Sequence, residues 1–243
     1  MLKEKILFFL EDKRGQVISG GQLAEEFGVS RTAVWKAMKS LIEEGNDIKS
    51  FPNSGYMLLE ESDGLNAKII SSKLRTQKIG KEINLLKTVE STNSYLKTKD
   101  LTLLNEGMCV IANEQTKGRG RFGRTFYSPF NQGIYMSVLL KPNMDIKDVS
   151  FITLCCAVAV CNAIEIICGV STSIKWVNDI FYEGKKVCGI LTEGIISAEA
   201  QTAEAVIIGI GVNTGNIHEK VADIASSLKN TGTNIGIRNE LIP

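Results

Sequence analysis

The chain has 243 residues, 44% of them hydrophobic, which suits one large domain with a small companion. Its formal net charge is +1, so binding to nucleic acid or to a membrane requires a local basic patch. A single histidine, His218, excludes multi-histidine metal sites. We therefore expect a globular protein without a dedicated metal site.

The six cysteines include no Cys-x-x-Cys pair, and the N-terminus shows no secretory signal. This pattern indicates reduced thiols and a cytoplasmic protein. The segment 149–170 is apolar enough to resemble a membrane span, but Asn162 and Glu165 interrupt it and it has no basic flank. We predict a buried core helix there and no membrane contact.

Apolar spacing in the first sixty residues predicts three helices. The first covers residues 2–10. Ser19 and Gln22 form a capping box that starts the second helix. Ser30 caps the third helix, which continues until Gly45.

Residues 48–51 and 56–59 flank the turn Pro-Asn-Ser-Gly and are predicted to form a β-hairpin. Three helices followed by a hairpin are the order of a winged helix-turn-helix, which we predict for residues 1–62. A polar, acidic stretch at 60–64 is typical of a linker, so the second domain is predicted to cover residues 63–243.

The outward side of the third helix suits the major groove of DNA, because no acidic residue occurs from 30 to 39. Residues 1–60 nevertheless contain eight Lys and Arg against nine Asp and Glu, so we expect two copies on a two-fold operator. The alternative is a winged module that only packs on its neighbour or binds protein. The candidate DNA-binding residues are Ser30, Arg31, Thr32, Trp35, Lys36 and Lys39.

In the second domain, Asn66 is predicted to cap a helix through Leu74, and residues 83–89 form a strand. That strand leads into the turn 90–94, in which all five side chains are able to form hydrogen bonds. These side chains either cap the next helix or face a polar ligand, and the sequence leaves both interpretations open.

The segment 113–127, NEQTKGRGRFGRTFY, is predicted to be a loop between strands at 108–112 and 133–140. Its glycines allow backbone N–H groups to approach an anion, and its basic side chains add charge-assisted hydrogen bonds. The alternative is a solvated basic loop. Without an anion, little is expected to hold the segment down. The basic residues are Lys117, Arg119, Arg121 and Arg124.

This loop also contains the dinucleotide fingerprint G-x-G-x-x-G. That motif is meaningful only where it ends a strand and opens a helix. Pro129 and Gly133 prevent a long helix here, so we exclude a nicotinamide or flavin site.

Strands at 173–176, 180–182 and 186–191 follow the core helix, and the last two are predicted to form a hairpin. The hairpin sets Asp179 near one end and Lys186 near the other. This pair either serves group transfer between an anion and an amine or is a surface salt bridge. A last buried strand, 205–212, ends at the surface with Asn213.

Four ordered segments resemble motifs of the bifunctional biotin–protein ligase and biotin operon repressor (BirA) family. They are GRGRFGR, KWVND, KKVCGIL and GIGVN. The resemblance covers nearly the whole chain. It implies an α+β fold in which an N-terminal winged helix-turn-helix precedes a mixed-sheet ligase domain of the class II synthetase-like type.

The resemblance also implies roles for individual residues. Biotin and its adenylate would be bound by Ser91, Thr92, Asn93, Gln115, Arg119, Gly120, Arg121, Asn178, Lys186 and Asn213. Lys186 would contact the reacting carboxylate and phosphate, Asp179 would orient the acceptor amine, and Arg121 would help to close the loop over the intermediate.

The implied substrates are biotin and ATP, with Mg²⁺ arriving on the nucleotide phosphates. Biotinyl-5'-AMP would then pass its biotin to a lysine of a biotin carboxyl carrier protein. The adenylate would also act as corepressor of a homodimer on operator DNA. Two departures from the family are Val177 in place of proline and the lack of a C-terminal β-barrel module after Pro243.

Two other functions fit parts of the sequence. A non-catalytic repressor that senses a small acid would keep the winged helix and the basic loop but give Asp179 and Lys186 no role. A lipoate ligase has the same general architecture, but the winged helix and the GRGR run argue against it.

Overall fold

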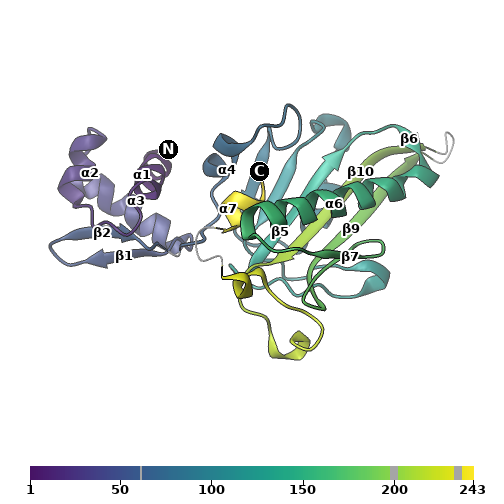
Figure 1. Ribbon diagram of the computed structural model, residues 1–243. Coiled ribbons are helices and arrows are strands. Elements are labelled where there is room, and N and C mark those ends of the chain that lie inside the picture. Colours follow the sequence, from purple (N-terminus) through teal and green to yellow (C-terminus); the bar gives the residue numbers. More distant parts are fainter. Residues whose placement is uncertain (61, 198–201, 233–236) are drawn as a thin grey trace.

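A computed structural model describes residues 1–60, 62–197, 202–232 and 237–243. Figure 1 shows a small helical body at the N-terminus beside a larger body built on one sheet. Glu61, within the predicted linker, lies outside the described residues.

The N-terminal body has the predicted order of three helices and a hairpin. Ser19 and Gln22 form the expected capping box, with distances of 3.1 Å and 2.9 Å between side-chain oxygen and backbone nitrogen. The Ser30 hydroxyl accepts the N–H of Ala33 at 3.2 Å. Both predicted helix starts are therefore confirmed. The elements are α1 (Leu2–Glu11), α2 (Gly20–Glu26), α3 (Arg31–Glu43), β1 (Ile48–Phe51) and β2 (Gly55–Leu58).

The larger body is built on a mixed sheet with the strand order β3-β4-β5-β10-β9-β8-β7, in which β3 and β4 are parallel and the other pairs antiparallel. β6 pairs with β10 beside this path. The strands are β3 (Ile83–Leu86), β4 (Cys109–Ala112), β5 (Gly133–Leu140), β6 (Met144–Asp145), β7 (Ser173–Lys175), β8 (Asp179–Tyr182), β9 (Lys185–Ser197) and β10 (Thr202–Asn213).

Strand β3 is shorter than predicted, because only Val89 of the following residues pairs again, in a single parallel bridge to Gln115. Strand β9 is longer than predicted, because it continues to pair with β10 beyond Leu191. The helices of this body are α4 (Ala67–Lys73), capped by Asn66 as predicted, α5 (Thr92–Lys97), α6 (Val149–Cys168) and α7 (Ile237–Leu241).

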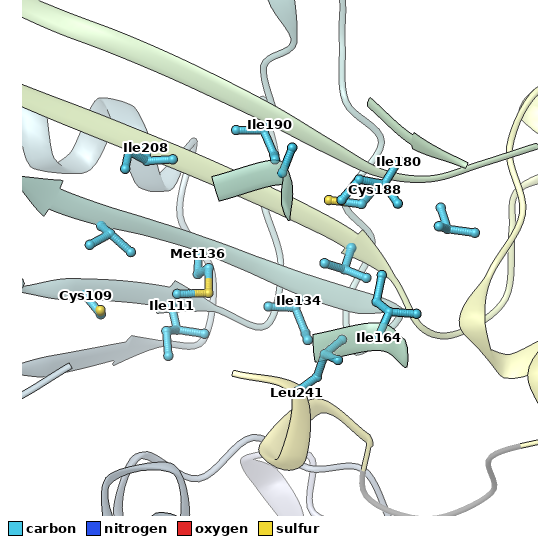
Figure 2. Packing of buried hydrophobic residues seen from close by; sticks show 14 of the residues in the cluster. Cys109, Ile111, Ile134, Met136, Ile164, Ile180, Cys188, Ile190, Ile208 and Leu241 are labelled. Carbon is cyan, nitrogen blue, oxygen red and sulfur yellow. The ribbon is translucent and has the colours of Figure 1, made fainter. Parts of the chain in front are cut away.

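The two faces of the sheet carry different layers because side chains alternate along each strand. On one face, Val206 and Ile208 of β10 belong to the main core under α6, part of which is drawn in Figure 2. On the other face, Ala205 and Ile207 pack in a smaller cluster with Leu96 of α5. The candidate site described below lies on the α5 side of the sheet.

The core helix predicted at 149–170 is confirmed as α6, but only one of its sides is buried. α6 covers the sheet with one side, where Ala157 and Ile164 are buried, while Phe151 and Ile166 are 61% and 79% exposed. α6 packs on the sheet and on α7, and its outer side faces solvent (Figure 1). By length and composition alone, the segment Ile146–Cys168, with a mean hydropathy of 2.3, is able to cross a membrane.

The short helix α7 fixes the segment that joins the two bodies. Arg238 is 1% exposed, and its Nε lies 3.1 Å from the Asp63 carboxylate. Its guanidinium also donates to the carbonyls of Asp63 and Gly133. Burial lowers the pKa of Arg238 and raises the pKa of Asp63, so the pair is desolvated. The junction is therefore held by a buried charge pair and is not a loose linker.

We predict that Arg238→Ala lowers the free energy of unfolding by about 3 kcal/mol or more, because it leaves Asp63 largely desolvated without its partner. The matched control is Lys73→Ala. It removes an exposed ion pair between α4 and Glu240 of α7, the helix that also carries Arg238, and should cost less than about 1 kcal/mol. Urea unfolding measures both. Equal losses in the two variants would contradict the role of the buried pair.

Candidate functional site

A pocket opens where the α5 side of β10 changes from large side chains to glycine. After Ile207, the next two positions on this side are Gly209 and Gly211. A Cβ on Gly209 would lie 2.5 Å from Oδ1 of Asn93, and a Cβ on Gly211 would lie 2.5 Å from the ring of Phe126. Side chains at these two positions would therefore fill the pocket.

This pocket gathers residues from distant parts of the chain. Strands β9 and β10 supply its floor, α5 supplies one wall, and the basic loop between β4 and β5 lies at its rim. Nine of the ten residues that the sequence predicted for biotin and adenylate line it: Ser91, Thr92, Asn93, Gln115, Arg119, Gly120, Arg121, Asn178 and Lys186.

The start of α5 serves both as a helix cap and as a pocket wall. The hydroxyl of Ser91 accepts the N–H of Ser94 at 3.4 Å, which caps the helix. The N–H and the hydroxyl of Thr92 donate to Oε1 of Gln115 at 2.9 Å and 3.1 Å. The capping interpretation is therefore confirmed, and because Ser91 and Thr92 also line the pocket, contact with a polar ligand stays a prediction.

The protein uses both N–H groups of the Asn93 amide and one acceptor position of its oxygen. Its Nδ2 donates to the Leu191 carbonyl at 3.2 Å and to Glu193 at 2.8 Å. Its Oδ1 accepts from the hydroxyl of Ser137 at 2.6 Å. Sequence reasoning missed Ser137 and Glu193, although each is a polar residue in an otherwise apolar strand, which is a signal that would have found them.

The basic loop is folded onto the site, and the expectation that little holds it is wrong. Its backbone forms a tight turn in which Gly120 N–H donates to the Arg124 carbonyl at 2.7 Å. Nη1 of Arg121 donates to Oδ1 of Asn178 at 2.8 Å, and Nη2 of Arg119 lies 3.4 Å from Glu193. No helix longer than one 3₁₀ turn follows the glycines, in line with the excluded dinucleotide site.

Asp179 begins β8 and Lys186 lies beside the turn of the hairpin, as predicted, but their side chains meet. A bulge between β8 and β9 shifts the register, and Nζ of Lys186 lies 2.8 Å from Oδ1 of Asp179. The two side chains are 30% and 26% exposed. Nδ2 of Asn178 also donates to this carboxylate at 2.9 Å. The pair therefore forms one half-buried charged cluster and is not an isolated surface bridge.

A second, larger cavity adjoins the pocket and includes Asp179 and Asn213, which the pocket does not. Several aromatic side chains line this aromatic cavity, among them Tyr127 and His218, whose rings pack edge to face at 5.0 Å. Sequence reasoning missed this wall because its members lie far apart in the chain. The residues common to both cavities are Gly120, Arg121, Phe126, Asn178 and Lys186.

The DNA-binding candidates lie on the exposed side of α3. A groove between this helix and the hairpin is lined by Arg31, Trp35 and Lys39, and Nζ of Lys39 lies 5.7 Å from the Trp35 ring. Ser30, Thr32 and Lys36 are also exposed, on the same helix end or side. The predicted outward orientation is therefore confirmed for all six residues.

The winged body also contacts the sheet body directly. Nζ of Lys68 lies 2.5 Å from the Glu4 carboxylate, and the Asn131 side chain donates to the Gly45 carbonyl at 3.3 Å. Across residues 1–60, 62–197, 202–232 and 237–243, no group of three or more His, Cys, Asp or Glu side chains is arranged to hold a metal ion.

Comparisons with known proteins agree with this arrangement. A family model described as the biotin/lipoate A/B protein ligase family matches residues 85–213, and a model of an HTH domain matches residues 3–57. The first match covers more than half of the chain. The solved biotin protein ligase of Aquifex aeolicus, in complex with biotin and ATP, has 34% identity and a TM-score of 0.55 over 67% of this chain and 66% of that chain.

The curated relatives include two bifunctional ligase/repressors. The one from Bacillus spizizenii is 35% identical over 231 residues, which are 93% of this chain and 70% of the relative. The one from Escherichia coli is 32% identical over 82% of this chain and 60% of the relative. The predicted family and fold class are thus confirmed: the chain belongs to the biotin/lipoate A/B protein ligase family and is homologous to its bifunctional BirA ligase/repressors.

Proposed function

We propose that this chain is an ATP-dependent biotin–protein ligase and a biotin-responsive repressor, with the winged domain in residues 1–62 and the ligase domain in residues 63–243. The observation that carries the proposal is the shared wall of the two cavities. A two-substrate adenylation needs both substrates to meet at cationic groups, and Lys186 and Arg121 lie where the cavities meet.

In the first step, biotin occupies the glycine-floored pocket and ATP the aromatic cavity. A carboxylate oxygen of biotin attacks the α-phosphorus, the bond to the β-phosphate breaks, and pyrophosphate leaves. Lys186 and Arg121 stabilise the negative charge that builds up on the phosphate oxygens. Mg²⁺ would be held by the nucleotide phosphates and would neutralise part of their charge.

In the second step, the lysine amine of a biotin carboxyl carrier protein attacks the carbonyl carbon of the mixed anhydride. An amide forms and AMP leaves. Asp179 lines the cavity beside Lys186, so its carboxylate accepts a hydrogen bond from the incoming amine and orients it. The two steps need positioning and charge stabilisation, and the site needs no protein nucleophile.

The repressor role rests on the exposed α3 face and on contacts between the two bodies. One copy of the winged domain carries too little positive charge to bind DNA tightly, so we propose that a homodimer binds the operator when the adenylate is present. We also propose a cytoplasmic location, because the spacing of the six cysteines indicates reduced thiols.

The test of the ligase function is exchange of radiolabelled pyrophosphate into ATP. Biotin should support exchange, because adenylation is reversible, and lipoate should not. Exchange with lipoate alone would make the protein a lipoate ligase. Binding of biotin without any exchange would make it a non-catalytic sensor.

We predict that Lys186→Ala lowers biotin-dependent exchange by about 100-fold while biotin affinity changes little, because the charge is needed most in the transition state. Lys185→Ala is the matched control. Its side chain donates to the Ala222 carbonyl and lines neither cavity. Equal losses in exchange and in biotin binding would rule out the proposed role of Lys186.

We also predict that Arg31→Ala combined with Lys36→Ala weakens operator binding and makes it less dependent on salt. The slope of log affinity against log salt concentration should fall in magnitude by about 2 for each copy. Adenylation should be unchanged, since both residues lie on α3. Lys5→Ala combined with Lys13→Ala removes the same charge from the α1 side and should retain most of the affinity. If the variant with Arg31→Ala and Lys36→Ala binds the operator as tightly as the parent, this face of α3 does not read DNA.

A further inference from the structure

Glu193 lies just behind the pocket, on the same side of β9 as Gly189 and Leu191. It pairs across the sheet with Ile207 and is 15% exposed. A carboxylate in such a position is unfavourable unless cations and hydrogen-bond donors surround it. Its partners therefore explain why it is tolerated there.

Three groups converge on this carboxylate. Oε1 accepts from Nζ of Lys97 at 2.7 Å, and Oε2 accepts from Nδ2 of Asn93 at 2.8 Å. Nη2 of Arg119 lies 3.4 Å from Oε1. Burial acts to raise the pKa of Glu193, but the hydrogen bonds from Lys97 and Asn93 and the nearby charges outweigh it, so the pKa lies below its ordinary value. The group is ionised at neutral pH.

An ionised carboxylate only accepts hydrogen bonds, so it permits one orientation of the Asn93 amide. The NH₂ group faces Glu193 and the Leu191 carbonyl, and Oδ1 faces Ser137 and the open space above Gly209. The carboxylate also holds one edge of the Arg119 guanidinium at the pocket rim. The remaining N–H groups of Arg119 stay available to a ligand.

We propose that Glu193 is a positioning residue for the adenylation site, which orients the Asn93 amide in the pocket wall and anchors Arg119 of the basic loop at the rim. The proposal rests on the proposed function in so far as biotin is the ligand. Glu193 does not line the pocket, so it acts through these two side chains and not by touching substrate.

Two effects of removing the carboxylate oppose each other. Arg119 would be freer to attract an anionic ligand, but it is 49% exposed, so solvent screens that gain. Asn93 is 3% exposed, and an unpaired buried amide N–H has no water to replace its partner. The loss at Asn93 therefore outweighs the gain at Arg119.

The test compares Glu193→Ala and Glu193→Gln with the parent by titrating the full chain with biotin and by measuring dissociation of biotinyl-5'-AMP. Glu193→Ala should weaken biotin binding by about 10- to 100-fold. Glu193→Gln keeps a carbonyl acceptor for Asn93, so biotin affinity should stay within about 3-fold of the parent, while adenylate should dissociate about 10-fold faster because Arg119 is released.

Lys97→Met is the matched control. It removes the third partner of the carboxylate, is part of the outer surface of α5 and does not line the pocket. Biotin affinity and adenylate dissociation should both stay within about 2-fold of the parent. If Lys97→Met loses as much as Glu193→Ala, the carboxylate acts through fold stability, and the positioning role is overturned. Parent-like biotin binding by Glu193→Ala would overturn it as well.

A second measurement needs no ligand and separates this proposal from the proposed function. Trypsin cleaves after basic residues of the loop, at Lys117, Arg119, Arg121 and Arg124. In ligand-free protein, both Glu193 variants should be cut in this loop several-fold faster than the parent, and Lys97→Met should not. A parent that fails to bind biotin would refute the ligase, whereas equal cleavage of all four proteins would refute the anchoring of Arg119.

Discussion

The central strand of this protein has to fill space on one face of the sheet and leave it empty on the other. In β10, Val206 and Ile208 pack under α6, while Gly209 and Gly211 face the pocket beside α5. The alternation of side chains along a strand makes both possible with consecutive residues. Core packing and ligand binding are thus assigned to opposite faces of one strand, and a single methyl group on either glycine would collide with the pocket wall.

The charges around the pocket are not all equally available to a ligand. Lys186 is paired with Asp179 at 2.8 Å, and Arg119 lies 3.4 Å from Glu193. Arg121 is held by the neutral amide of Asn178, and no carboxylate among the described residues forms an ion pair with it. A site arranged in this way holds its cations in position before an anion arrives, which reduces the conformational entropy lost on binding.

The ligand site and the DNA-binding module are joined by the short segment 128–132. The Ser128 carbonyl accepts the N–H of Gln115 at 3.0 Å, next to the pocket. The Asn131 side chain donates to the carbonyl of Gly45, at the end of α3. Gln132 accepts the N–H groups of residues 214 and 215 at the rim of the aromatic cavity. One continuous stretch of five residues therefore contacts Gln115 of the pocket wall, the residues that follow β10 and Gly45 just after α3.

Local sequence determined the helices of the winged domain and the loop between β4 and β5, because caps such as Ser19 and Ser30 and the apolar spacing act within a few residues. The motifs also predicted many of the residues that line the pocket. Only the tertiary structure decided that Lys186 contacts Asp179, that Glu193 reaches Arg119, and that one side of α6 is exposed. Those outcomes depend on strand register and on layers brought together from distant segments, and the local pattern of residues does not encode either.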